Sequence, residues 1–210
     1  MIDVTNMNTV PPLKRLHQKR RQPLRTRSAL LDAAVEIIDK EGWSAVTTTR
    51  VAAQAGLSRG ALQHHFYASN ELLLAVADEL GAKLNGWIEP SDLLALPLAV
   101  RVERLLAHYY EVYSSRLFRA VMSLLLDPAS TVAVHIRKKN YADQDRIHET
   151  WRAAFSDTGV SESKLSGLRR MAMATVRGYA LREQITEGDS WSEDLVLLQE
   201  FLLRELQNAG

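Results

Sequence analysis

The chain of 210 residues contains no cysteine, which excludes a disulfide framework, a thiolate metal site and a cysteine nucleophile. It also has no apolar run near the roughly 20 residues that a membrane-spanning helix requires. The charged N-terminal segment is not followed by the apolar stretch of a secretory signal. These absences predict a cytoplasmic protein without a membrane partner.

Sequence motifs for catalysis and metal binding are missing as well. There is no G-x-S-x-G, no H-E-x-x-H and no glycine-rich phosphate loop. His64 and His65 are adjacent, so on a helix they diverge by about 100° and cannot easily share a metal. His108, His135 and His148 are scattered along the chain. We therefore expect no catalytic residue, no metal site and no cofactor, and an enzyme is kept only as the alternative class of function.

Charge is distributed unevenly, although the formal net charge is only +1. Residues 1–66 hold ten Lys and Arg against five Asp and Glu, whereas residues 67–210 hold sixteen against twenty. A basic N-terminal part therefore precedes a mildly acidic body. An electrostatic surface for phosphate groups is expected on the N-terminal part alone.

The most informative segment is 47–66, TTTRVAAQAGLSRGALQHHF, which predicts two short helices joined by a tight turn. Val51 and Ala52 place apolar side chains on one face of the first helix. Gly56 can adopt the left-handed conformation that ends this helix, and Ser58 can cap the next one with its hydroxyl oxygen. This arrangement of two helices around a glycine turn is typical of a helix-turn-helix.

The second helix of this pair has an inner and an outer face. Leu62 and Phe66 lie four residues apart and anchor the helix to the core. The outer face carries hydrogen-bond donors and one glycine that permits close approach: Arg59, Gly60, Gln63 and His64. The alternative is a purely structural helical hairpin in an all-α domain. The lack of any acid from residue 58 to residue 70, together with the basic surroundings, favours DNA binding instead.

The segment from Thr26 to Leu74 resembles the DNA-binding domain of the tetracycline-repressor (TetR) family of bacterial transcription regulators. The matching residues are RSALLDAAVEIIDKEGW, TTTRVAAQAGLSRGAL, HHF and ELLLAV. Two positions depart from the family pattern. Gln63 stands where a phosphate-contacting tyrosine is usual, and Ser69 stands where a lysine is common.

This resemblance implies an all-α fold, with an N-terminal three-helix DNA-binding domain and a larger C-terminal helical domain for ligand binding and dimerisation. We place the domains at 26–70 and 71–210, after a basic arm over 1–25. The implied function is that of a ligand-responsive regulator, in the first instance a repressor. Such a protein binds a palindromic, double-stranded DNA operator as a homodimer and is released by a small-molecule effector.

The DNA-binding residues are predicted around the second helix. Residues at the start of the first helix of the pair hold phosphates and fix the register. Arg59 is the candidate for reading bases, because its guanidinium fork matches the O6 and N7 acceptors of guanine. The predicted DNA-binding residues are Thr48, Thr49, Arg50, Ser58, Arg59, Gly60, Gln63, His64 and His65.

Apolar periodicity predicts helices along most of the remaining chain and no strands. The expected helices cover about 26–41, 69–87, 97–114, 116–126, 130–156, 162–187 and 191–207, with a loop over 89–92. The arm over 1–25 mixes three prolines with six Lys and Arg, so it cannot bury enough apolar surface to fold alone. We expect it to be disordered and able to follow DNA phosphates.

The last two expected helices carry more apolar surface than one contact face needs, which indicates burial on more than one side. Burial inside the monomer is one interpretation. The resemblance implies instead a four-helix bundle between two copies, to which Ala174 and Gly178 would give close approach. The predicted dimer-interface residues are Leu168, Ala172, Thr175, Tyr179, Leu195, Leu198, Leu202 and Leu206.

Aromatic and methionine residues in the middle helices predict an apolar ligand chamber with a few polar groups. The same residues at helical spacing are also typical of plain core, and this alternative stays open for each of them. The candidate pocket residues are Tyr109, Tyr113, Phe118, Met122, His135, Trp151, Phe155, Met173 and Arg177. A helical protein–protein adaptor would explain the apolar C-terminal helices but not the basic N-terminal part.

Overall fold

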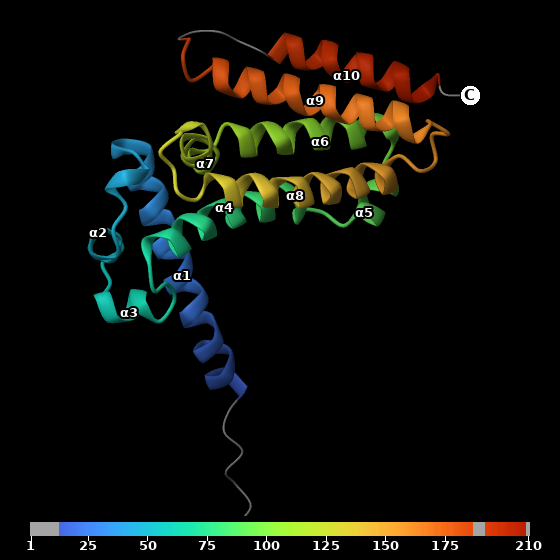
Figure 1. Cartoon of the computed structure of the whole chain (residues 1–210). Coiled ribbons are helices and arrows are strands. Elements are labelled where there is room, and N and C mark those ends of the chain that lie inside the picture. Colours follow the sequence, from blue (N-terminus) through green and yellow to red (C-terminus); the bar gives the residue numbers. More distant parts are fainter. Residues whose placement is uncertain (1–12, 187–191, 209–210) are drawn as a thin grey trace, which may run out of the picture.

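The computed structural model describes residues 13–186 and 192–208, which form helices joined by turns and loops, without a strand (Figure 1). The all-α prediction is confirmed. The elements are α1 Leu13–Glu41, the 3-10 helix η1 Trp43–Ala45, α2 Thr48–Gln54, α3 Arg59–Gln63, α4 Ser69–Asn85, α5 Pro90–Leu94, α6 Leu98–Tyr113, α7 Arg116–Leu126, α8 Ala133–Ala154, α9 Glu162–Arg182 and α10 Ser192–Gln207.

The N-terminal unit consists of α1 to α3 and the first turns of α4. α1 packs against α2 and α4, and α2 packs against α3. Each helix contributes fully buried apolar side chains to one core: Leu30, Ala34, Val51, Leu62 and Leu72. Because the inner faces are fixed by this core, the opposite faces of α2 and α3 are left exposed.

The first helix is longer than predicted. It begins at Leu13 rather than near residue 26, so the part of the arm over 13–25 is helical and the expectation of disorder is wrong there. Lys, Arg, Leu and Gln dominate this stretch and favour helix, and the packed part of α1 supplies the nucleus for its extension. The extended N-terminal end of α1 projects away from the body, beyond α3 (Figure 1). Residues 1–12 of the predicted arm lie outside the described residues.

The body is a layered bundle. α6 packs against both α9 and α10, which form the outer layer, while α4 and α8 pack together on the other side (Figure 1). The short helix α5 was not predicted, since residues 89–92 were expected to form a loop. Pro90 starts it, as proline suits a first helical position, and the fully buried Leu93 holds it against the body. α9 ends at Arg182, earlier than expected.

The two parts of the chain are joined by packing and by polar contacts. α7 packs against α1 and η1, and α4 runs continuously from the N-terminal unit into the body. The Trp43 indole donates a hydrogen bond to Asp127 at 2.7 Å. The Arg119 guanidinium makes a two-pronged contact with Asp39 at 2.8 and 2.9 Å. Among the described helices, none is long and apolar enough to cross a membrane.

Candidate nucleic-acid interface and interior cavity

The turn between α2 and α3 is built by local backbone chemistry. The Thr47 side chain caps α2 by accepting a hydrogen bond from the Arg50 amide at 3.2 Å. Gly56 has φ +66°, in the left-handed region that favours glycine. Its amide donates to Ala53 O at 3.1 Å, and the next amide, that of Leu57, donates to Ala52 O at 2.9 Å. This pair of bonds ends α2 and redirects the chain into α3.

The short helix α3 presents the predicted outer face to solvent. The Ser58 hydroxyl caps it by accepting a hydrogen bond from the Ala61 amide at 3.1 Å. Leu62 and Phe66 are buried and fix its orientation. The exposed residues on or beside α3 are the predicted ones: Ser58, Arg59, Gly60, Gln63 and His64. This face of α3 is therefore accessible to a partner as large as double-stranded DNA.

Arg59 and Arg50 were predicted together but lie in different surroundings. Arg59 is exposed, and no described residue forms an ion pair or hydrogen bond with its guanidinium. Arg50 is also exposed, but its Nη2 forms an ion pair with Glu41 Oε1 at 2.5 Å. This contact lowers the pKa of Glu41, so the carboxylate stays charged at neutral pH. A phosphate would have to compete with Glu41 for Arg50, whereas Arg59 is unengaged.

The remaining predicted DNA-binding residues divide by exposure. Thr49 is exposed at the start of α2, while Thr48 is half-buried. His65 is half-buried beside the Phe66 ring, with 6.4 Å between the ring centroids. His64 and His65 lie just after the last residue of α3 rather than within it.

Tyr67 is an exposed residue that the sequence interpretation did not single out. Its side chain is 85% exposed directly after the buried Phe66. Its amide donates to Glu71 Oε2 at 2.9 Å, which holds the backbone at the start of α4. The sequence contained a signal for Tyr67: it is an aromatic residue directly after the HHF motif, four residues beyond Gln63, which stands where an aromatic residue is usual.

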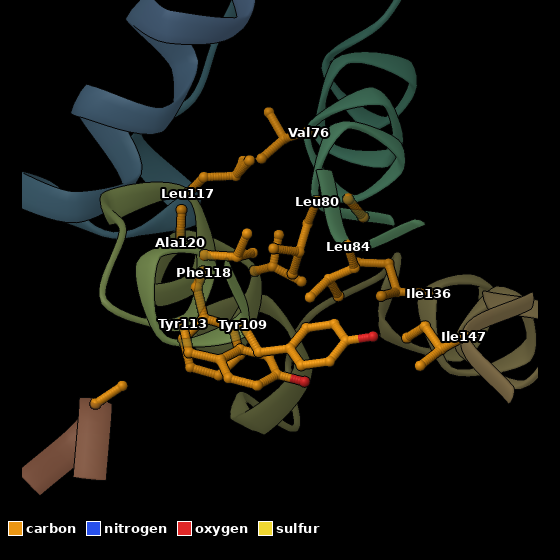
Figure 2. Close-up of a cluster of buried hydrophobic side chains, with 14 of the residues drawn as sticks. Val76, Leu80, Leu84, Tyr109, Tyr113, Leu117, Phe118, Ala120, Ile136 and Ile147 are labelled. Atoms are coloured by element: carbon orange, nitrogen blue, oxygen red, sulfur yellow. The ribbon is translucent and has the colours of Figure 1, made fainter. Parts of the chain in front are cut away.

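A cavity lies in the middle of the body, where the ligand chamber was predicted. It has a volume of about 70 Å³ and lies among side chains of α4, α7, α8 and α9; Figure 2 shows the cluster around Leu80, Leu84, Phe118 and Ile136. Four predicted residues line it: Tyr113, Phe118, Met122 and Arg177. The sequence interpretation missed two polar lining residues, Lys139 and Gln144.

The other predicted pocket residues do not line this cavity. Tyr109, Trp151, Phe155 and Met173 are buried in the core. The Trp151 indole donates to the Tyr109 hydroxyl at 3.2 Å, so both polar ends are satisfied within the core. The prediction of His135 is wrong, because its side chain is exposed on the outer face of α8. Helical spacing alone could not separate cavity walls from core, as both use the inner face of a helix.

The predicted dimer residues need a similar correction. Five of them are already buried within their own chain, where a second copy could not reach them: Leu168, Ala172, Leu198, Leu202 and Leu206. Thr175, Tyr179 and Leu195 are half-buried. The exposed apolar and small residues of α9 and α10 are neighbouring ones instead: Met171, Ala174, Gly178, Leu181, Val196 and Leu197. A Cβ built on Gly178 would meet no atom within 4 Å, so nothing in this chain packs closely there.

The packed α1–α3 unit, the capped turn and the exposed α3 face define a helix-turn-helix DNA-binding protein. The sequence profile described as "Bacterial regulatory proteins, tetR family" matches residues 30–76. Over 64 residues, 30% of each chain, the sequence is 45% identical to the HTH-type transcriptional regulator BetI of Rhizobium meliloti. These matches identify residues 30–76 as a DNA-binding domain of the TetR family of transcriptional regulators.

Two further relatives extend the similarity over the body. The HTH-type transcriptional regulator CymR of Pseudomonas putida is 23% identical over 161 residues, 76% of this chain and 79% of CymR. The solved structure of NalD, the secondary repressor of the MexAB-OprM multidrug efflux pump in Pseudomonas aeruginosa, matches with a TM-score of 0.59 at 18% identity. That match covers 86% of this chain and 96% of NalD, and at this identity it shows a shared fold.

Proposed function

We propose that this regulator is a homodimeric repressor that binds a palindromic operator and leaves it when a small molecule binds in the body. The observation that carries the proposal is Arg59, exposed on α3 and without a partner among the described residues. The buried Leu62 holds the same short helix against the core, so the guanidinium is presented from a fixed position. A fork-shaped donor presented in this way is suited to the acceptors of guanine in the major groove.

The proposal of a homodimer is supported by the outer surface of α9 and α10. Met171, Ala174 and Gly178 recur at helical spacing along one exposed side of α9. Val196 and Leu197 are more than half exposed on the neighbouring α10. Apolar side chains on two adjacent helices, next to small residues that permit close packing, suit burial against the same surface of a second copy. Two copies supply the two α3 helices that a palindrome requires.

The release step is supported by the position of the interior cavity. Its walls include Leu80 and Leu84 of α4 and Phe118 of α7. α4 and α7 are also the helices that pack against α1 of the N-terminal unit. An effector that binds better to a rearranged cavity than to the present one shifts the population toward a different placement of the two N-terminal units. The operator then fits less well.

The experiment is a footprint of the purified protein on the DNA upstream of its own coding region, at several salt concentrations and with unrelated competitor DNA. We expect a short protected palindrome that resists the competitor. Genome-wide selection of bound fragments follows if that region is unprotected. The proposal is overturned if the selection recovers no enriched sequence, because only non-specific phosphate binding then remains.

A further inference from the structure

Arg169 on α9 is a buried cation that forms no ion pair with any described residue. It is 6% exposed, and no described carboxylate lies within ion-pair distance of its guanidinium. Nη1 donates to the amide oxygen of Gln144 at 2.8 Å and lies 3.8 Å from the sulfur of Met173. Nε has no hydrogen-bond partner. Burial and the nearby charge of Arg170 lower the pKa of Arg169, and the opposing effects of Tyr109, Tyr113 and Asp145 offset this only in part.

Arg101 shows that this fold pairs a buried arginine when the role is structural. It is also 6% exposed. Its two terminal nitrogens contact the carboxylate of Asp157 at 2.6 and 2.7 Å, and further bonds go to the carbonyls of Leu96 and Ala154. Buried charges are normally satisfied in this way, because leaving one unpaired is costly. Arg169 departs from that pattern in the same chain.

Arg177 lies about two helical turns further along α9. Its Nη2 donates to the Tyr113 hydroxyl at 3.4 Å, its guanidinium carbon lies 5.0 Å from the centre of that ring, and its Nε is also unsatisfied. Arg177 and Gln144 line the interior cavity, as does Lys139. The described lining residues include no acid, and most of them are apolar. Gln144 therefore connects the cavity to Arg169, lining the one and binding the other.

We propose that Arg169 and Arg177 receive the carboxylate of a small amphipathic effector, whose apolar part enters the cavity between α4, α7 and α8. This inference rests on the proposed effector-controlled function and names the chemical class of the effector. The carboxylate replaces the Gln144 oxygen as the acceptor for Arg169 and satisfies the free Nε group. A guanidinium binds a carboxylate through two parallel charge-assisted hydrogen bonds, whereas a neutral amide leaves the buried charge uncompensated.

The cavity must widen to admit this molecule. At about 70 Å³ it is well below the ~300 Å³ at which ligand sites of proteins begin. Met122 of α7 is half-buried in the wall and is the most adaptable of the lining side chains. Widening displaces side chains of α4 and α7, the two helices in contact with the N-terminal unit. Binding of the acid is thereby coupled to the position of α3.

The test compares carboxylates with their matched neutral amides on the full-length protein. The probes are benzoate, phenylacetate and octanoate against benzamide, phenylacetamide and octanamide, measured by calorimetry and by the shift in melting temperature. We expect at least one acid to bind and its amide to bind at least about tenfold more weakly, as the strength of charge-assisted bonds implies. Binding of no acid, or equal binding of acid and amide, overturns the inference.

Arginine variants locate the site. Arg169→Gln and Arg177→Gln should each weaken the selected acid by about tenfold or more. Arg170→Gln is the control, because Arg170 is exposed on the same helix and should leave the affinity unchanged. Since no described carboxylate forms an ion pair with Arg169, Arg169→Met should melt no lower than the wild type in the absence of acid. Unchanged acid binding in both Gln variants overturns the inference.

DNA binding measured on the same samples separates the two proposals. If the protein binds an operator but prefers no acid over its amide, the repressor proposal stands and the carboxylate site is rejected. If the protein binds an acid through Arg169 and Arg177 but binds no specific DNA, the carboxylate site stands and the repressor proposal is rejected.

Discussion

Trp43 and Asp127 are 84 positions apart in the sequence, and the indole Nε1 donates a hydrogen bond to the carboxylate Oδ2 at 2.7 Å. Trp43 belongs to η1, next to the helix-turn-helix, and Asp127 ends α7 in the body. This bond and the packing of α7 against α1 join the two parts of the molecule. It also lowers the pKa of Asp127, so the acceptor is charged at neutral pH.

We expect Trp43→Phe and Asp127→Asn to lower the melting temperature at neutral pH, with the double variant no worse than the poorer single one. That result follows if both changes remove the same interaction. Because the pKa of Asp127 is lowered in the folded protein, the contribution is present above its ordinary value of 3.8 and is lost as the pH falls through the lowered pKa. Thermal melts of the cycle at neutral and acid pH measure it. Fully additive losses would mean that the two residues act separately.

Arg59→Ala should weaken binding to the operator by roughly 5- to 150-fold, the value of about 1–3 kcal/mol for a bidentate base contact. Binding to unrelated DNA should change little, because phosphate contacts remain. Arg104→Ala is the matched control, since Arg104 is exposed on α6 in the body. Gel-shift titrations on operator and unrelated DNA measure both affinities. An equal loss on both DNAs would assign Arg59 to the phosphate backbone instead.

Ala174→Arg should convert the dimer to a monomer while leaving the chain folded. Ala174 is exposed within the chain, so an arginine there has room in the monomer but would clash and bury charge at an interface on α9. Light scattering after gel filtration gives the mass, and circular dichroism gives the helix content. Ala107→Arg on the exposed side of α6 is the control and should stay dimeric. A dimer that survives Ala174→Arg would place the interface elsewhere.

Asp157→Asn should destabilise the fold by removing the partner of the buried Arg101. We expect a loss of about 1–2 kcal/mol in the free energy of unfolding, at the low end for a buried charge because Asp157 is half exposed. Arg101 lowers the pKa of Asp157, so this stability is present above the ordinary value of 3.8 and disappears as the pH falls through the lowered pKa.

Urea unfolding at neutral and acid pH measures the effect of Asp157→Asn. The exposed Glu103 on the same helix as Arg101 provides the control variant Glu103→Gln, which should unfold like the wild type. The difference between Asp157→Asn and the wild type should shrink in acid. A difference that is independent of pH would indicate a loss of packing rather than of the ion pair.

Local chemistry made much of the N-terminal unit predictable from sequence. Gly56 and Ser58 specify a turn and a cap through backbone geometry that depends only on near neighbours. Leu62 and Phe66 show which face of α3 is inward, because their spacing matches one side of a helix. The outer face, with Arg59, followed from the same pattern. The length of α1 did not, because helix extension over 13–25 competes closely with disorder.

The body depended on tertiary packing. The sequence identified apolar faces on α9 and α10 but not the elements that pack against them. Leu202 was therefore predicted to face a second copy, although it is buried within its own chain, where α10 packs against α6. Likewise, helical spacing could not distinguish the exposed His135 from the cavity-lining Arg177. The sequence by itself determined most of the helices, the capped turn between α2 and α3 and the outward face of α3, because these depend on contacts within a few residues. Only the tertiary structure decided that Arg101 meets Asp157 whereas Arg169 meets no described carboxylate, because such pairing joins residues that are far apart in the chain.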